Sequence, residues 1–149
     1  MSGPGWSNYA HQRLAGTGYR RGGARSAVIA LLDGESCALS AIQIEDALRD
    51  GGRRVGRATV YRVLDELDGL GLVTKLEIGD GLTRYEAVFP DGTEHHHHLV
   101  CDGCGKLTPF TDDELERTIR RVARREAFAI IDHDVTLHGS CEACTPGRT

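Results

Sequence analysis

Residues 57–70 read RATVYRVLDELDGL, and this stretch decides how the first half of the chain folds. Apolar side chains recur in it at spacings of three and four residues, which is the pattern of a helix with one buried face. The remaining positions carry mainly arginine, threonine, tyrosine and acidic residues, so we expect an amphipathic helix from Arg57 to about Leu70. Its apolar positions are Val60, Val63, Leu64, Leu67 and Leu70.

Two shorter helices are expected ahead of this one. Residues 25–32 hold an apolar run that stops at an Asp-Gly pair, as a buried helix would. Ser40, with Gln43 three residues later, has the form of a capping box, and the helix that it opens should end at the following Gly-Gly pair. Residues 1–18 are rich in glycine, serine and polar groups without a clear period, so we expect a flexible or loosely helical arm there.

Two runs of alternating apolar and polar residues follow the long helix, at residues 73–78 and 83–88, around a glycine-rich turn. This pattern predicts a β-hairpin. Three helices followed by a hairpin match a winged helix-turn-helix, in which the last helix enters the major groove of DNA and the hairpin lies beside it. We expect this domain to occupy residues 19–89 and a hinge to occupy residues 90–93.

Residues 94–149 are expected to form a small α/β domain, so that the chain as a whole belongs to the α+β class. Thr111 and Glu114 have the spacing of a second capping box, ahead of a helix whose apolar side chains should face the core of this domain. These apolar positions are Leu115, Ile119, Val122 and Ala123. Strands are predicted at residues 94–100, 106–110 and 134–138.

The 149 residues have the composition of an ordinary globular protein, with 40% hydrophobic and 27% charged residues. No run approaches the roughly 18 consecutive apolar residues that a bilayer span needs, and the N-terminus has no apolar block typical of a signal peptide. We therefore expect a cytoplasmic protein with no membrane partner.

The net charge of −4 is unevenly distributed along the chain, because residues 1–62 hold 9 Lys and Arg against 5 Asp and Glu. A basic front half fits a domain that faces phosphates.

Four of the five cysteines form two Cys-x-x-Cys pairs separated by 36 residues, Cys101 with Cys104 and Cys141 with Cys144. Four soft thiolates at this spacing are typical of a closed, tetrahedral zinc site, although four free or redox-active thiols are the alternative. We predict a structural Zn²⁺ that stabilises a domain whose own core is small. We interpret Cys37, outside this set, as a small buried or half-exposed residue rather than a ligand.

Four consecutive histidines lie just ahead of the first cysteine pair. On a strand, successive side chains point to opposite faces, so His95 and His97 would share one side while His96 and His98 share the other. One run can thereby serve two metal sites, and imidazole suits Zn²⁺, Fe²⁺, Ni²⁺ and Cu²⁺. A solvated histidine run that binds nothing is the alternative. Candidate partners in these sites are Glu86, Glu116 and His133.

The polar face of the helix at residues 57–70 supplies candidate DNA contacts. We expect Tyr61 and Arg57 to reach base edges, with the tyrosine ring against a thymine methyl group. Arg62 and Thr59 should meet phosphates. For each arginine, a solvated surface charge is the alternative.

The sequence bears on two other classes of function, an enzyme and a zinc-storage protein. Histidine and glutamate around zinc can activate water, but the sequence shows no His-Glu-x-x-His motif and no phosphate-binding loop, so we do not expect an enzyme. A zinc-storage protein that does not bind DNA would explain the cysteines and histidines. It would leave the polar, arginine-bearing helix unexplained.

Three ordered motifs resemble the ferric uptake regulator family. They read ATVYRVL at residues 58–64, HHHHLVCDGCGK at residues 95–106 and HGSCEAC at residues 138–144. The similarity runs from about Leu14 to Cys144, nearly the whole chain. It implies a metal-dependent repressor that dimerises through its C-terminal half and binds palindromic operators in double-stranded DNA.

The resemblance also distributes the candidate ligands among three sites. The four paired cysteines match a structural zinc site. A site within the dimerisation half matches His95, His97, Glu116 and His133. A regulatory site at the hinge matches Glu86, His96 and His98. On the DNA-binding side, the resemblance places Arg20 at a minor groove, and Lys75 and Arg84 along the backbone beside the hairpin.

The sequence departs from the family pattern near the hinge. Pro109 stands where iron-type members often have a carboxylate, and Cys37-Ala38 takes the approximate place of a histidine that the DNA-binding half commonly donates. Zinc-type relatives often carry an aspartate and a cysteine at the hinge, whereas this chain has Thr74 and no cysteine near Glu86 in the sequence. We expect Fe²⁺ slightly ahead of Zn²⁺ as the sensed metal. The alternatives are a zinc-uptake or a peroxide-responsive regulator.

Overall fold

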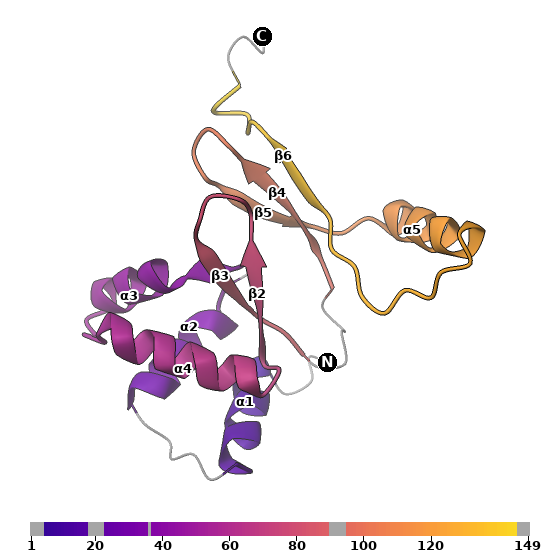
Figure 1. The fold of residues 1–149 in the computed structure, drawn as a ribbon. Helices are drawn as coiled ribbons and strands as arrows, with labels where there is room; N and C mark the ends of the chain where they lie inside the picture. The colour runs from indigo at the N-terminus through magenta and orange to yellow at the C-terminus, as the bar shows by residue number, and fades with distance from the viewer. Residues whose placement is uncertain (1–4, 18–22, 36, 90–94, 146–149) are drawn as a thin grey trace. The chain divides into compact units, whose positions relative to one another are not determined.

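The chain divides into two compact units, Met1–Glu94 and His95–Thr149. The computed structural model describes residues 5–17, 23–35, 37–89 and 95–145. Figure 1 colours the first unit from indigo to magenta and the second from orange to yellow. The predicted hinge at residues 90–93 lies outside the described residues.

The described part of the first unit contains four helices and three strands. The helices are α1 (Trp6–Ala15), α2 (Gly23–Asp33), α3 (Ala41–Asp50) and α4 (Arg57–Gly69), and the strands are β1 (Leu39–Ser40), β2 (Val73–Glu77) and β3 (Thr83–Ala87). The three helices and the hairpin that the sequence predicts are confirmed. The two-residue strand β1 is an addition that no sequence pattern indicates.

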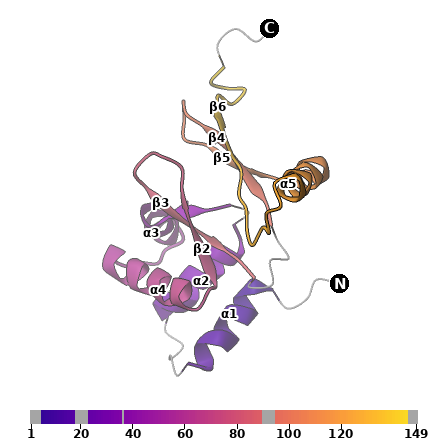
Figure 2. The same cartoon turned by 45° about the vertical axis from the view of Figure 1, so that its right-hand side comes forward.

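The core of the first unit forms where α2 contacts α1, α3 and α4 (Figure 2). The buried face of α4 is confirmed, because Val60, Leu64 and Leu67 have no exposed surface. Burying each such side chain stabilises the fold by about 1.5–3 kcal/mol. This packing fixes α4 by its apolar face, so its polar face is left outside the core.

Local hydrogen bonds and strand pairing complete the first unit. The backbone N–H of Gln43 donates to Oγ of Ser40 over 3.2 Å, and the N–H of Ser40 donates to Oε1 of Gln43 over 2.9 Å, which confirms the capping box. The sheet is antiparallel in the order β1-β3-β2. Tyr85, at the centre of β3, pairs with Leu39 on one side and with Lys75 on the other.

Helix α1 is a regular helix packed into this core, where the sequence led us to expect a flexible or loosely helical arm. The indole N–H of Trp6 lies 3.0 Å from the carbonyl oxygen of Leu72 and 3.1 Å from that of Val88. Through Trp6, the helix is therefore hydrogen-bonded to the residue just before β2 and to the residue just after β3. Its buried residues recur every four residues, a helical spacing that the surrounding glycine, serine and polar residues obscure, and they are Trp6, Ala10 and Leu14.

The described part of the second unit contains three strands and one helix. They are β4 (His97–Cys101), β5 (Leu107–Phe110), α5 (Asp113–Arg125) and β6 (Thr136–Gly139), so the predicted elements are confirmed. Strand β4 lies between the other two, antiparallel to β5 and parallel to β6. A parallel neighbour requires a crossover connection, and α5 lies in that connection (Figure 1).

Helix α5 differs from its prediction in two ways. Its N-cap is Asp112 rather than Thr111, because the Asp112 carboxylate accepts the backbone N–H of Leu115 over 2.8 Å. No residue of α5 is buried within the chain, which corrects the expectation that its apolar stripe faces a core. Val122, for example, is 41% exposed.

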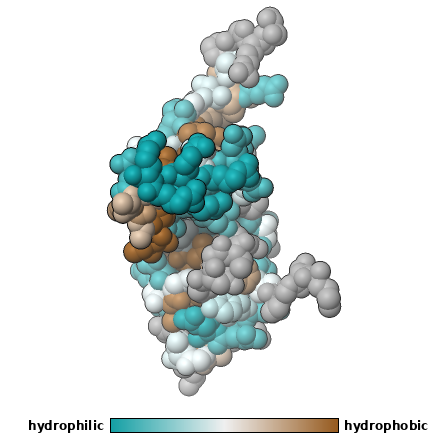
Figure 3. All heavy atoms as spheres, turned by 90° about the vertical axis from the view of Figure 1, so that its right-hand side faces the viewer, coloured by the Kyte–Doolittle hydropathy of each residue, from teal (hydrophilic) through white to brown (hydrophobic). Residues whose placement is uncertain are grey.

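Apolar side chains lie open elsewhere in the second unit as well. Ile131 is fully exposed and Phe128 is 69% exposed. In Figure 3 brown, apolar atoms are visible beside the teal, hydrophilic surface on the side of the molecule that carries α5. A single chain therefore leaves apolar surface of this unit uncovered. The larger exposed apolar residues of the unit are Leu99, Val122, Phe128, Ile131 and Leu137.

Candidate metal centres and nucleic-acid interface

The four paired cysteines come together at one end of the sheet in the second unit. Cys101 ends β4 and Cys104 lies in the turn after it, while Cys141 and Cys144 belong to a matching turn after β6. Because β4 and β6 are parallel neighbours, both turns leave the sheet at the same end. One Sγ from each residue lies within 4.8 Å of the others. The predicted grouping of four thiols that could hold one metal ion is confirmed.

The surroundings of these sulfurs favour a cation. The backbone N–H of Cys141 donates to Sγ of Cys101 over 3.3 Å, and such amide bonds lower the pKa of the Cys101 thiol to about 6. Hydrogen bonding with the Cys141 thiol, followed by the other sulfurs, raises the pKa of Cys144 to about 12. One thiolate therefore forms readily, whereas four thiolates would repel one another without a positive ion between them. This donor set fits tetrahedral Zn²⁺.

A second cluster surrounds Glu116, in the first turn of α5. Its Oε1 lies 2.6 Å from Nε2 of His97, and its Oε2 lies 2.8 Å from Nε2 of His133. Nε2 of His95 lies 3.7 Å from Oε1 of the same carboxylate. One ligand atom from each of the four residues lies within 4.8 Å of the others. The structure thus brings together the set that the family resemblance assigns to the dimerisation half.

The charges in the Glu116 cluster suit a metal ligand set. The hydrogen bond from His97, and then that from His133, lowers the pKa of Glu116, so its carboxylate is ionised at neutral pH. Burial, followed by repulsion from His97, lowers the pKa of His95 and favours the neutral imidazole that binds metals. Such nitrogen and oxygen donors suit Zn²⁺, Fe²⁺ and Mn²⁺.

His97 is held in one orientation inside this cluster. It has no exposed surface, and the backbone N–H of Val135 donates to its Nδ1 over 3.0 Å. Its Nε2 therefore carries the proton that is donated to Glu116. A metal ion bound through Nε2 would take the place of this proton, so binding there is expected to release a proton.

The residues expected at the hinge belong to different units. Glu86, on β3 of the first unit, is 8% exposed. In the second unit the ring centroids of His96 and His98 lie 4.9 Å apart. Within the first unit, Sγ of Cys37 lies within 4.8 Å of a carboxylate oxygen of Glu86. The family resemblance puts Cys37 in the approximate place of a hinge histidine, but local sequence patterns do not show that it lies beside Glu86, because the pairing of β1 with β3 brings the two residues together.

The outer face of α4 carries residues that the sequence analysis expects to contact DNA. Tyr61 is 43% exposed, although its ring is large and apolar. Nη2 of Arg62 donates to Oγ1 of Thr59 over 3.1 Å, one turn along the same helix. Nε of Arg57 donates to Glu45 on α3 over 2.9 Å. Arg20 lies outside the described residues.

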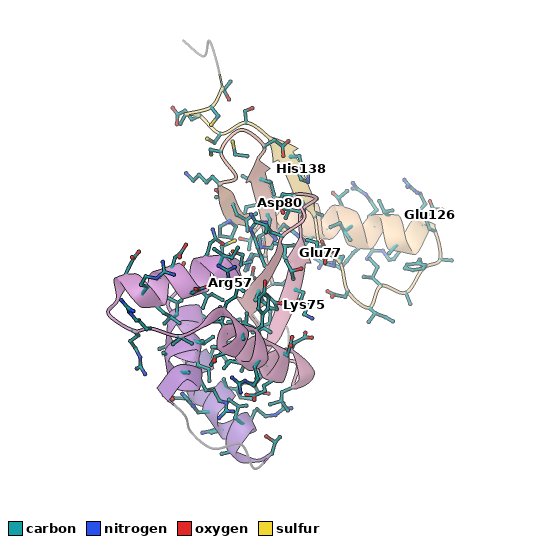
Figure 4. All side chains as sticks on the ribbon, turned by 60° about the vertical axis from the view of Figure 1, so that its left-hand side comes forward. Arg57, Lys75, Glu77, Asp80, Glu126 and His138 are labelled. Atoms are coloured by element: carbon teal, nitrogen blue, oxygen red, sulfur yellow. The ribbon has the colours of Figure 1, made fainter. Side chains whose placement is uncertain are left out.

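The two basic residues expected on the hairpin are engaged in ion pairs, and Figure 4 labels Lys75 on β2 together with Asp80 in the turn. Nζ of Lys75 lies 3.3 Å from the carboxylate of Asp68, whose hydrogen bond raises the pKa of Lys75. The guanidinium of Arg84 donates to both carboxylate oxygens of Asp80, over 3.1 and 2.8 Å. The Arg84 side chain is only 7% exposed, so it stiffens the hairpin in the free protein.

Comparison with known proteins identifies the family of the chain. The sequence model of the ferric uptake regulator family matches residues 16–138. The chain belongs to this family. The ferric uptake regulation protein of Bacillus subtilis (strain 168) is 34% identical over 139 residues, which cover 93% of each chain. That of Escherichia coli (strain K12) is 38% identical over 104 residues, covering 69% of this chain and 68% of that one.

Solved structures of ferric uptake regulators share the fold. The Vibrio cholerae protein is 32% identical with a TM-score of 0.76, covering 88% of this chain and 98% of that one. The Helicobacter pylori protein is 25% identical with a TM-score of 0.81, covering 97% and 94% of the two chains. The predicted family resemblance and α+β fold class are therefore confirmed.

Family members are transcription regulators rather than enzymes. None of the described helices has the length and apolar character that a bilayer span requires.

Proposed function

We propose that this chain is a metal-dependent transcriptional repressor of metal-homeostasis genes, and that it binds palindromic operators as a homodimer in the cytoplasm. The Glu116 cluster carries this proposal, because it gives a chain with a winged-helix unit a set of four metal-competent side chains. The H. pylori relative is described as having three functional metal-binding sites, which supports a metal-responsive role. Zn²⁺ at the four paired cysteines is the structural metal in this proposal.

The exposed apolar surface of the second unit supports the proposed dimer. Val122, Phe128 and Ile131 are exposed by 41%, 69% and 100%, and a second copy of the chain would cover them. A twofold dimer buries the same patch on both copies. It also presents one α4 helix from each copy, which matches the two halves of a palindromic operator.

Helix α4 is the proposed reader of the DNA sequence. The exposed ring of Tyr61 would lie against a thymine methyl group, and Thr59 and Arg62 would meet phosphates. Arg57 would exchange its bond to Glu45 for a base edge. That exchange removes the ion pair between Arg57 and Glu45, so we expect Tyr61 to contribute more to operator affinity than Arg57.

The hairpin and the segment before α2 are proposed to contact DNA outside the reading helix. Lys75, whose side chain is 44% exposed, would reach the phosphate backbone by leaving Asp68. Arg84 would have to leave Asp80 and its buried position, which makes its contact the weaker of the two. Arg20 is proposed to enter a minor groove, as the family resemblance implies.

The regulatory metal is proposed to join Glu86 of the first unit to His96 and His98 of the second. Two recognition helices must lie about one DNA turn apart, roughly 34 Å, to enter successive major grooves. A free hinge spreads them over many orientations, and restricting the hinge lowers the entropy lost on binding. A tenfold gain in operator affinity requires about 1.4 kcal/mol. The V. cholerae relative is described as showing rearrangement of its DNA-binding domains, which supports a movable hinge.

The identity of the regulatory metal depends on the donor atoms. One carboxylate and two imidazoles slightly favour Fe²⁺ over Zn²⁺ in this proposal. A zinc-uptake regulator is the second candidate, and the thiol of Cys37 beside Glu86 favours it. A peroxide-responsive regulator would bind Fe²⁺ and gain oxygen on His96 or His98 when peroxide is added.

Selection of DNA from a random pool tests the proposed function. Full-length protein is incubated with random double-stranded DNA, with Fe²⁺ or Zn²⁺ and in parallel with chelator, and the bound sequences are read. We expect inverted repeats in the metal-loaded sample only. Tyr61→Ala should abolish this enrichment, whereas Asp65→Asn on the same helix should not. Metal binding without any enriched sequence would contradict the proposal and indicate a zinc-storage protein instead.

A further inference from the structure

The first unit places a thiol beside a carboxylate. Sγ of Cys37 lies within 4.8 Å of a carboxylate oxygen of Glu86, and Glu86 is 8% exposed. Cys37 is half-buried and is a free thiol, and it takes no part in the cluster of four cysteines in the second unit. A cysteine and a carboxylate on one unit thus form a pair of potential ligands.

We propose that Cys37 is a ligand of the regulatory metal, beside Glu86. This inference rests on the proposed function, because it completes the same site with His96 and His98. Zn–S bonds are about 2.3 Å and Zn–O bonds about 2.0 Å long, so a tetrahedral ion separates two such ligand atoms by about 3.5 Å. The spacing of Cys37 and Glu86 allows both to bind one ion after small side-chain adjustments.

A thiolate in this position changes the metal that the site prefers. Carboxylate and imidazole donors bind Fe²⁺, Mn²⁺ and Zn²⁺, whereas a thiolate selects zinc from this group. Four donors, one sulfur, one oxygen and two nitrogens, also complete a tetrahedron, which is the usual geometry of zinc. A Cys37 thiolate therefore reverses the slight preference for Fe²⁺ that Glu86, His96 and His98 alone would give, and makes Zn²⁺ the regulatory metal.

Cobalt is a direct probe of a metal–sulfur bond. Full-length protein that retains one structural zinc per chain is titrated with Co²⁺ while its ultraviolet and visible spectra are recorded. We expect a sulfur-to-cobalt charge-transfer band whose final intensity corresponds to one sulfur-bound Co²⁺ per chain, beside any Co²⁺ in the Glu116 cluster, while the zinc content stays constant. Cys37→Ser should lose this band and bind Zn²⁺ at least tenfold more weakly, with Mn²⁺ affinity changed less than threefold.

Alkylation of the unaltered protein gives a second measurement that needs no variant. Zn²⁺ added beyond the structural zinc, in an amount sufficient for both the Glu116 cluster and the hinge site, should protect Cys37 from iodoacetamide, as read by mass spectrometry of the peptide. Glu86→Ala should weaken this protection. Circular dichroism of the Cys37→Ser variant checks that its fold is retained.

The outcomes separate this inference from the function on which it rests. If added metal switches DNA binding on but gives neither a band that depends on Cys37 nor protection of its thiol, the inference is overturned and the proposed function stands. If no metal binds beyond the structural zinc and DNA binding does not respond, both fail. A band in wild-type protein that disappears in Cys37→Ser supports both.

Discussion

Cys101 and Gly139 are direct partners on the parallel strands β4 and β6. This pairing places the two Cys-x-x-Cys turns next to each other although 36 residues separate them in the sequence. The backbone N–H of Asp102, which follows Cys101, donates to the carbonyl oxygen of Gly139 over 2.8 Å. The metal-binding end of the second unit therefore depends on sheet pairing as well as on the cysteines.

The packing of Gly103 against Cys144 gives a first prediction. A Cβ at position 103 would lie 3.1 Å from Cβ and 3.3 Å from Sγ of Cys144. Gly103→Ala should therefore push the second turn away and speed the loss of zinc to a chelator several-fold. Gly139→Ala is the matched control, because a Cβ at that position meets no atom within 4 Å. Equal zinc release by the two variants would show that the close contact is not needed.

The sequence predicts those parts of the fold that depend on local signals. The period of α4, the Ser40 capping box and the alternating hairpin each lie within a short segment, and each is confirmed. The two cysteine pairs are recognisable because metal binding fixes their spacing. The family resemblance then groups the histidines around Glu116 as the structure does.

Features that depend on distant parts of the chain are not visible in the sequence. Cys37 and Glu86 are neighbours because β1 pairs with β3, so only the family resemblance, and no local pattern, brings Cys37 to the hinge. In helix α1 the buried positions recur every four residues, but Ala10 is small and polar residues surround these positions, so the local signal is weak. The sequence correctly predicts helix α5 and its apolar positions, but none of its residues is buried in the single chain.

The hydrogen bond from Trp6 to Leu72 gives a second prediction, on stability. Trp6→Phe keeps an aromatic ring in the core but leaves the carbonyl oxygens of Leu72 and Val88 without the indole N–H. It should destabilise the protein by about 1–3 kcal/mol. Tyr9→Phe removes a partly buried bond to Arg13 and should cost less than about 1 kcal/mol. Denaturant unfolding of both variants checks the order, and an unchanged midpoint for Trp6→Phe would indicate that α1 is detached.

The ion pair between Arg84 and Asp80 gives a third prediction, on pH. The hydrogen bond from Arg84 lowers the pKa of Asp80 below its ordinary value of 3.8. A lowered pKa in the folded state contributes stability above the unfolded pKa, and this contribution is lost as the pH falls through the folded pKa. Titration of the Asp80 carboxyl by NMR should give a pKa below 3.8, and Arg84→Ala should raise it. A pKa that is the same in both proteins would show that the pair is open in solution.

The exposed apolar surface gives a fourth prediction, on assembly. Ile131 is fully exposed in the single chain, so Ile131→Asp should leave the fold of the chain intact but oppose burial against a second copy. Sedimentation should show a dimer for the wild type and a shift toward monomer for this variant, with a dissociation constant raised at least tenfold. Asp132→Ala, at the adjacent exposed position, serves as the control. A wild-type protein that is monomeric at micromolar concentration would contradict the proposed dimer.

Control of DNA binding by a metal ion is tested most directly by one titration. Chelator-treated protein that keeps its structural zinc is mixed with a fluorescent operator from the selection experiment, and Zn²⁺, Fe²⁺ and Mn²⁺ are added in turn while anisotropy is measured. We predict that one metal raises operator affinity at least tenfold as the hinge site fills, with no more than two added ions per chain. Operator affinity that is the same with and without every metal would contradict the account.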